Sequence, residues 1–145
     1  MKNINNCLIA ILFAVLCGSS TYAVAQDQFV VIANKQVPQE TINKSTVKRI
    51  YNGFTTQWKN SNKIKPSYIQ IPNEAFWKYM GTTKANFQKF WTKRTFSGNG
   101  VSPIEHMSNI DVINYVNKIP GAIGIIEVKD KNSIGSNCKV LNHTD

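Results

Sequence analysis

The sequence predicts a single α/β domain, and three observations support this. Two nearly unbroken apolar runs, at residues 29–33 and 122–128, are rich in branched side chains, as in strands buried on both faces of a sheet. Between them, segments with apolar residues at helical spacing accompany a shorter alternating run at 65–71. No repeat or low-complexity linker interrupts the 145 residues, so we expect one compact domain with a mixed sheet flanked by helices.

The N-terminal segment predicts export from the cytoplasm. A basic Lys2, an apolar block at 7–17 and the small residues Ala23-Val24-Ala25 are the three parts of a secretory signal peptide. The apolar block is too short to span a bilayer as a helix. We therefore expect a signal peptide over 1–25, cleavage after Ala25, a mature domain over 26–145 and a periplasmic location.

A second interpretation of the same segment is lipidation at Cys17. Residues 12–17 resemble a lipobox, although Leu16 stands where a small residue is expected. Mass spectrometry of the exported protein distinguishes the two, because cleavage after Ala25 leaves Gln26 at the N-terminus and lipidation leaves a diacylglycerol-modified Cys17. The signal contains two of the three cysteines, so Cys138 has no partner for a disulfide within the mature chain.

The chain is strongly basic, with 17 lysines and arginines against 8 acidic residues and a formal net charge of +9. Most basic residues recur singly, as on an ordinary solvated surface. The alternative is attraction to an anionic ligand or membrane face.

The expected elements follow the chain in the order β-α-β-α-α-α-β-β. Ser45 is the expected N-cap of the first helix, which Gly53 ends, and Asn73 is the expected cap of the second. Thr82 or Thr83 is expected to cap the third, and Ser108 with Asp111 the fourth. After the Pro120-Gly121 turn, strands are expected at 122–128 and 138–141.

Large aromatic residues have both a structural and a functional interpretation. Trp58 stands alone in a polar loop, where a packing role is expected. Phe87, Phe90 and Trp91 share one helical face, which predicts core, with a stacking surface for a ligand as the alternative. We expect one core to contain Val31, Ile50, Phe87, Trp91, Val116, Ile123 and Ile125.

Residues for catalysis or metal binding are not grouped in the sequence. His106, His143 and Cys138 lack ligand spacing, and no nucleophile elbow or phosphate-cradling glycine loop is present. Glu105 and His106 are adjacent, so their side chains need not face each other. The sequence therefore predicts no enzyme, no cofactor, no metal and no nucleic-acid partner.

Several motifs carry a resemblance to a known family. The segment 50–53 (Ile-Tyr-Asn-Gly) followed by Trp58, then Phe90-Trp91, then the loop 97–100 (Ser-Gly-Asn-Gly), and finally 120–125 (Pro-Gly-Ala-Ile-Gly-Ile) occur in one order. Together they resemble periplasmic phosphate-binding proteins, the receptors of ABC-type phosphate importers, over roughly 29–128. The resemblance implies one lobe of a type II periplasmic-binding-protein-like fold, since the receptors have two lobes and this chain is long enough for one.

The segment 69–76 departs from that family. The receptors hold phosphate there with an arginine and a Ser-Gly-Thr sequence, whereas this chain has Ile-Gln-Ile-Pro-Asn-Glu-Ala-Phe. Glu74 would lie in the first turn of its helix, where a carboxylate takes the favourable interaction with the helix dipole and repels an anion.

An oxyanion could instead bind at the glycine loop through backbone N–H groups, without an arginine. The candidate ligand-binding residues are Ser97, Gly98, Asn99, Gly100, Ser102, Thr82, Thr83, Lys84 and Arg94. The alternative is structural: the two glycines permit positive φ angles in a tight connection, and the serines satisfy local backbone groups.

Two functions of different kinds follow. The first is binding of a small oxyanion such as phosphate, as an accessory to uptake by a membrane transporter. The second is a non-catalytic interaction module that docks a partner protein, or a second copy in a homodimer, through the face that a second lobe would cover.

Overall fold

The computed structural model describes residues 28–70, 72 and 74–144. Its six strands form one sheet in the order β2-β6-β1-β5-β3-β4. The strands are β1 (Phe29–Asn34), β2 (Thr41–Asn43), β3 (Lys65–Ile69), β4 (Ile104–His106), β5 (Ala122–Glu127) and β6 (Cys138–Thr144). The helices are α1 (Lys44–Tyr51), α2 (Glu74–Met80), α3 (Lys84–Phe96), α4 (Asn109–Lys118) and the short 3-10 helix η1 (Val128–Ser133).

The sheet is mixed, which confirms the predicted fold class. Strand β1 runs antiparallel to β5 and β6, with Val31 opposite Ile125 and Leu141 respectively. Strand β3 runs parallel to both β5 and β4. The two apolar runs of the sequence thus pair with each other at the centre of the sheet, where both faces are covered.

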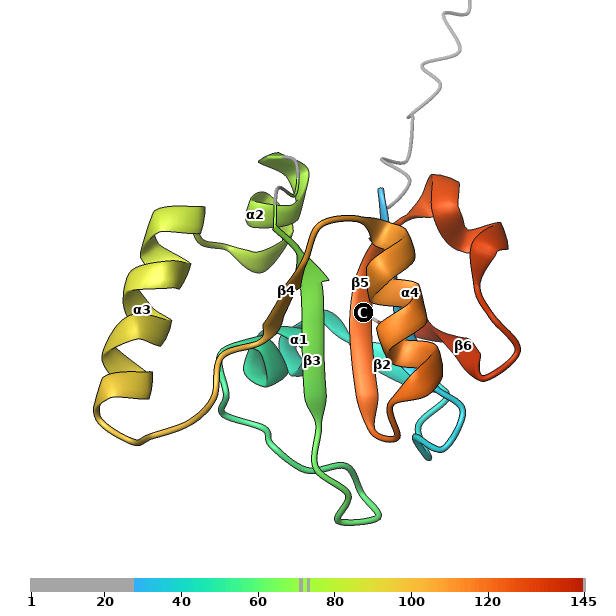
Figure 1. The fold of residues 1–145 in the computed structure, drawn as a ribbon, viewed down its shortest axis with the longest axis horizontal. Helices are drawn as coiled ribbons and strands as arrows, with labels where there is room; N and C mark the ends of the chain where they lie inside the picture. The colour runs from blue at the N-terminus through green and yellow to red at the C-terminus, as the bar shows by residue number, and fades with distance from the viewer. Residues whose placement is uncertain (1–27, 71, 73, 145) are drawn as a thin grey trace, which may run out of the picture.

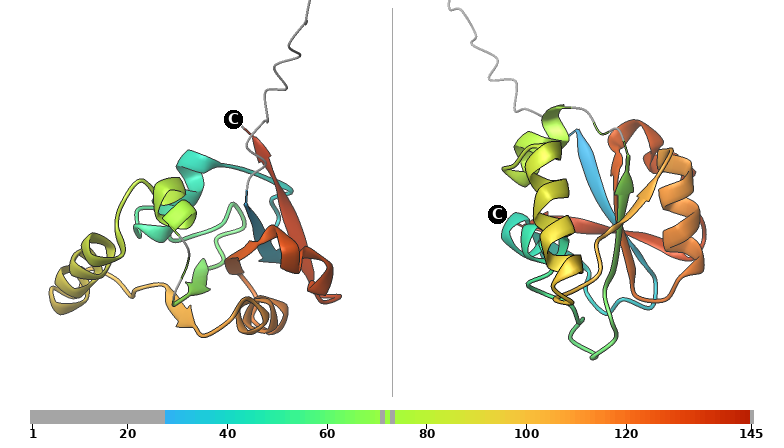
Figure 2. Two further views of the ribbon diagram at one scale, coloured as in Figure 1. Left: turned by 90° about the horizontal axis from the view of Figure 1, so that it is seen from above. Right: turned by 60° about the vertical axis from the view of Figure 1, so that its left-hand side comes forward.

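Helices cover the two faces unequally (Figures 1 and 2). Helix α4 lies along one face, while α1 and α2 lie on the other. Helix α3 stands apart, beyond β4 at the edge of the sheet. Within the described part of the chain, none of these helices has the length and apolar character needed to cross a membrane.

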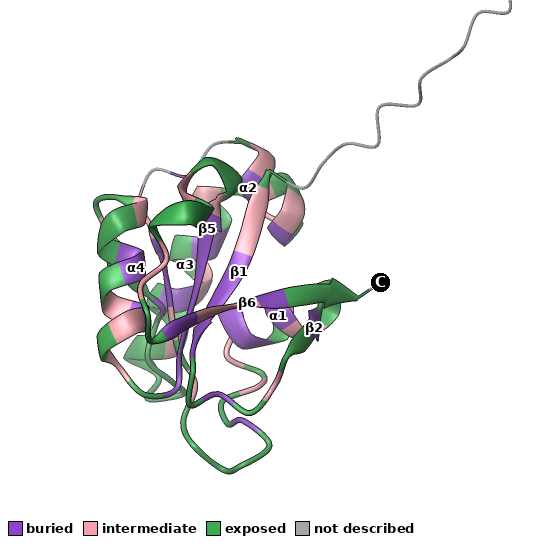
Figure 3. Cartoon of the chain, turned by 90° about the vertical axis from the view of Figure 1, so that its right-hand side faces the viewer, coloured by how far each residue is buried: buried purple, intermediate pink, exposed green. Residues whose placement is uncertain are grey.

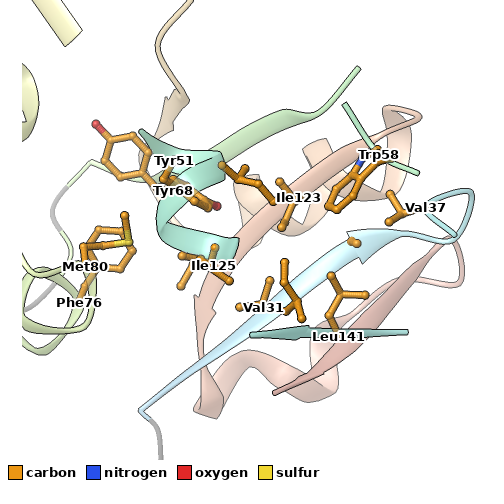
Figure 4. Packing of buried hydrophobic residues seen from close by; sticks show 14 of the residues in the cluster. Val31, Val37, Tyr51, Trp58, Tyr68, Phe76, Met80, Ile123, Ile125 and Leu141 are labelled. Atoms are coloured by element: carbon orange, nitrogen blue, oxygen red, sulfur yellow. The ribbon is translucent and has the colours of Figure 1, made fainter. Parts of the chain in front are cut away.

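The buried side chains form two clusters, one on each face of the sheet. The larger contains Val31, Ile50, Phe87, Trp91, Ile123 and Ile125, as expected, together with Tyr51 and Tyr68 (Figure 4). The smaller, beneath α4, contains Ile32, Val112, Ile113, Val116 and Ile126. The prediction of a single core was therefore wrong for Val116, because the sheet separates it from the other six residues.

Polar side chains cap three of the helices. Asn43, and not Ser45, caps α1: its side chain accepts a hydrogen bond of 2.8 Å from the Thr46 N–H. Thr83 caps α3 and Ser108 caps α4, and the Ser108 hydroxyl also donates to Asp111. The capping role predicted for Asn73 falls outside the described residues, as does Ile71 at the end of the expected second strand.

Two three-residue strands, β2 and β4, were not predicted, and the 3-10 helix η1 begins at Val128, the last residue of the strand expected at 122–128. Strand β6 is longer than expected and passes from buried to exposed toward the C-terminus (Figure 3).

Trp58 fills a packing role, as predicted, since it is 5% exposed and its Nε1–H donates to the Gly121 carbonyl at 2.9 Å. Cys138 is buried, and burial raises the pKa of its thiol.

Candidate functional site

A hollow of the described surface lies between α3 and the edge strand β4. We call it the α3–β4 groove, and its volume is about 770 Å³. It is lined by Tyr68, Phe87, Gln88, Trp91, Thr92, Thr95, Phe96, Val101, Ser102, Pro103, Ile104 and Glu105. Its size falls within the range of ordinary ligand sites.

The floor of the groove is formed by a cross-strand pair. Tyr68 of β3 stands opposite Glu105 of β4, and the Tyr68 hydroxyl donates a hydrogen bond to Glu105 Oε1. Burial raises the pKa of Tyr68 far above its usual range, and the hydrogen bond and charge of Glu105 raise it further. The pair therefore presents a carboxylate held by a protonated tyrosine.

The wall of the groove is α3, which two aromatic residues attach to the core. Phe87 and Trp91 are 4% and 5% exposed, and the Trp91 Nε1–H donates to the Tyr51 carbonyl at 3.0 Å. Phe90 is partly buried against them. The aromatic face of this helix is therefore core, as predicted, while Thr92 and Thr95 are exposed along the groove.

Exposed apolar side chains gather around the groove and along the edge of the sheet beside it. Within the described residues, the large apolar side chains that are exposed are Phe54, Phe96, Val101, Ile104, Met107, Ile110 and Val128. Five of these lie within residues 96–110, and Phe96 and Val101 are 87% and 86% exposed. Exposed apolar side chains that gather in this way are typical of interaction sites in soluble proteins.

The glycine loop ends α3. The N–H groups of Ser97, Gly98 and Asn99 donate to carbonyls of the last helical turn, at 3.1, 3.1 and 2.9 Å. The Ser97 hydroxyl also donates to carbonyls of that turn, and Gly98 and Gly100 have φ angles of +70° and +144°. These contacts are those of the structural alternative, and they occupy three of the N–H groups that an anion would need.

Arg94 connects this loop to the end of α1. Its Nη2 donates to the Asn99 carbonyl at 2.8 Å and lies 3.4 Å from the Gly53 carbonyl. The guanidinium lies over the rings of Phe54, Phe90 and Trp91, with centroid distances of 5.5, 5.6 and 5.7 Å. Arg94 Nη2 and the guanidinium face thus make structural contacts, whereas the buried Nε of Arg94 has no hydrogen-bond partner among the described residues.

The remaining candidate residues lie at the other end of α3. Thr82, Thr83 and Lys84 surround its N-terminus, and thirteen residues at 1.5 Å each place them about 20 Å from the glycine loop. Ser102 lines the α3–β4 groove. The candidate residues therefore lie at the two ends of α3, with Ser102 in the groove, and the structure does not bring them all together.

Sequence reasoning did not identify Tyr68 and Glu105 as a pair. It did recognise that the side chains of Glu105 and His106 need not face each other. Glu105 lines the groove, whereas the His106 ring packs on Tyr115 of α4, with the two ring centroids 5.1 Å apart. The recurrence of Phe96, Val101, Ile104, Met107 and Ile110 in a polar stretch was the available signal for the groove.

Among the described residues, no three histidine, cysteine or acidic side chains gather as a metal site.

Solved structures share this fold. An ABC-type phosphate transport receptor from Vibrio cholerae matches with a TM-score of 0.59 and 21% identity, over 82% of this chain and 48% of that one. A putative phosphate ABC transporter substrate-binding protein from Clostridium perfringens, with bound phosphate, matches with a TM-score of 0.62 and 17% identity, over 81% and 45%. A possible phosphate binding protein from Planctomyces limnophilus matches with a TM-score of 0.60 and 13% identity, over 82% and 42%.

Comparison of the sequence with protein-family models and with curated proteins gives no significant match. This chain spans about half the length of the structures that it matches. The resemblance noted in the sequence is therefore confirmed at the level of architecture: the chain has the fold of one lobe of a phosphate-transport substrate-binding protein.

Proposed function

We propose that this chain is a non-catalytic binding domain that acts outside the cytoplasm and holds a partner protein in the α3–β4 groove. The observation that carries the proposal is the exposed apolar surface of residues 96–110, of which Phe96, Val101 and Ile104 line the groove. A ligand of a few atoms would leave most of that surface in water. A protein partner would cover it.

The proposed location rests on the signal-like N-terminal segment, and the fold supports it because the matched structures include transport receptors. A membrane transporter is one partner that fits such a domain.

Photo-crosslinking in the exporting cell tests this proposal. A photoreactive amino acid at Thr92 or Thr95 places the crosslinker in the groove, and one at Lys59 places it on a distant exposed loop. We expect one discrete adduct from the groove positions, absent from Lys59 and lost when Phe96→Ser is added. Equal adducts at all three positions, or none in the groove, would contradict the proposal.

A second candidate is binding of a small oxyanion, because one structural neighbour holds phosphate. The residues concerned are those at the glycine loop and the α3 N-terminus. Calorimetric titration with phosphate and sulfate tests it, in the parent and in a Gly98→Val, Gly100→Val variant. Saturable heat in the parent that disappears in a folded variant favours the anion. No saturable heat at millimolar anion favours the partner protein.

A further inference from the structure

We infer that the α3–β4 groove recognises an extended, basic segment of a partner protein, which joins the sheet as a seventh strand beside β4 and pairs a lysine or arginine with Glu105. This inference rests on the proposed function and specifies the partner. Strand addition to an open sheet edge is a recurrent mode of peptide recognition.

Strand β4 has a free edge for such a segment. It is the terminal strand of the sheet and pairs within the described structure with β3 alone. The His106 carbonyl accepts a hydrogen bond of 2.7 Å from the Gln70 N–H, on the β3 side. Successive residues of a strand direct their N–H and C=O groups to opposite edges, so those of Glu105 face the open edge.

Helix α3 provides a wall for the added strand. It lies beyond β4 and not over it (Figures 1 and 2). Side chains of both α3 and β4 line the groove. Side chains of a strand alternate between the two faces of a sheet. One set would enter the groove beside Trp91, Thr95 and Phe96, and the other would meet the exposed Met107 and Ile110.

The charge in the groove selects the partner. Glu105 is the one charged residue among those that line the groove. The ion pairs of the described residues are Lys129–Glu127 and Lys139–Glu40, so the Glu105 carboxylate lacks a cation. Its Oε1 accepts from Tyr68, and Oε2 can accept from a cation. A basic residue directly opposite Glu105 would form a favourable cross-strand pair.

These positions define a recognition pattern. The basic residue opposite Glu105 shares its face with the residues two before and two after it, which would enter the apolar groove. The expected segment therefore reads apolar-x-Lys/Arg-x-apolar. Pro103 offers no N–H at the start of β4, which limits pairing to a short segment.

A second copy of this chain fits the edge less well. A two-fold antiparallel pairing centred on Glu105 would place two carboxylates opposite each other, which is destabilising. The partner is therefore a different chain whose basic residue lies within an apolar, extended segment.

Selection from a random-peptide display library against the purified protein tests the inference. We expect enriched peptides to share the apolar-x-Lys/Arg-x-apolar pattern and to lose binding to Phe96→Ser. A synthetic enriched peptide should bind Glu105→Gln about threefold to fivefold more weakly, as for the loss of a cross-strand ion pair. Glu40→Gln removes one negative charge at the opposite edge and should leave binding unchanged.

Amide hydrogen exchange shows whether the bound peptide joins the sheet. Binding should slow exchange of the Glu105 N–H. Three results would overturn this inference without contradicting the proposed function. They are enriched groove-binding peptides that lack a basic residue, unchanged peptide binding to Glu105→Gln, and no slowing of exchange at the Glu105 N–H. Enriched peptides that bind Phe96→Ser equally well would overturn both. Light scattering that shows a dimer dissolved by Phe96→Ser would assign the edge to a second copy.

Discussion

Helices α3 and α4 pack against the sheet in different ways. Helix α4 buries Val112, Ile113 and Val116 against the smaller cluster, and these buried side chains are all aliphatic. Helix α3 buries Phe87 and Trp91 and leaves Phe96 almost fully exposed. Both begin at a hydroxyl N-cap, Thr83 or Ser108, so the difference does not arise from how the helices start.

The difference arises from what each helix meets on the sheet. Beneath α4, Gly124 leaves space that a Cβ would fill: such an atom would lie 2.5 Å from Val112 Cγ1 and 3.1 Å from Val116 Cγ2. Helix α3 instead contacts the core through large aromatic rings at the edge of the sheet. Helix α4, which packs over Gly124, therefore covers its face of the sheet. Helix α3, which aromatic rings hold at the edge of the sheet, leaves the α3–β4 groove beside it.

The largest expected effect is at the anchor of α3. Trp91→Ala removes a buried indole and its hydrogen bond to the Tyr51 carbonyl, so we expect a loss of ~3–5 kcal/mol in the free energy of unfolding. Chemical denaturation measures it. Phe96→Ala on the same helix is the control and should change stability by less than ~0.5 kcal/mol. A fall of a degree or two in the thermal midpoint of Trp91→Ala would show that Trp91 is not an anchor.

The close packing of α4 gives the next effect. Gly124→Ala places a methyl group against Val112 and Val116, so we expect a loss of ~1–3 kcal/mol from overpacking. Adding Val112→Ala should cost less in this variant than in the parent, because it frees the space that the new methyl group needs. Additive losses in denaturation experiments would show that the two residues do not compete for space.

The helix caps sharpen the comparison. Thr83→Ala and Ser108→Ala each remove a side chain that accepts from a helix N–H, at 3.2 Å in both cases, and should cost ~1 kcal/mol. Amide hydrogen exchange should distinguish them. In Thr83→Ala we expect faster exchange confined to α3, because this helix can open without the sheet, whereas Ser108→Ala should accelerate exchange through the sheet. The same exchange pattern in both variants would remove the distinction.

The smallest effect concerns His106, which packs on Tyr115 of α4. Burial lowers its pKa below the ordinary value of 6.5, so the folded protein binds fewer protons there than the unfolded chain. The associated stability is complete above about pH 6.5 and is lost as the pH falls through the lowered pKa. We expect the thermal midpoint to fall by roughly a degree or two near pH 5. In His106→Gln the thermal midpoint should no longer fall between about pH 6.5 and pH 5. The same fall in parent and variant would contradict the assignment of this pH dependence to His106.

The sequence by itself determined much of the fold through short-range rules. The apolar runs at 29–33 and 122–128 became the central strands, because a continuous run of branched residues fits a strand buried on both faces. The hydroxyl cap at Ser108, and a cap at Thr82 or Thr83 of which the structure uses Thr83, follow from the local sequence. The Phe87–Trp91 spacing correctly placed the aromatic face of α3 in the core.

The tertiary structure alone decided the edges of the sheet and the groove. Strands β2 and β4 are three residues long and have mixed polarity, so only pairing with β6 and β3 makes them strands. Val116 and Ile123 belong to different clusters because they meet opposite faces of the sheet, a fact that periodicity along one segment cannot contain. Tyr68 and Glu105 are far apart in the chain and meet only through strand register. The groove depends on that register and on where α3 lies, because its lining combines side chains from separate segments.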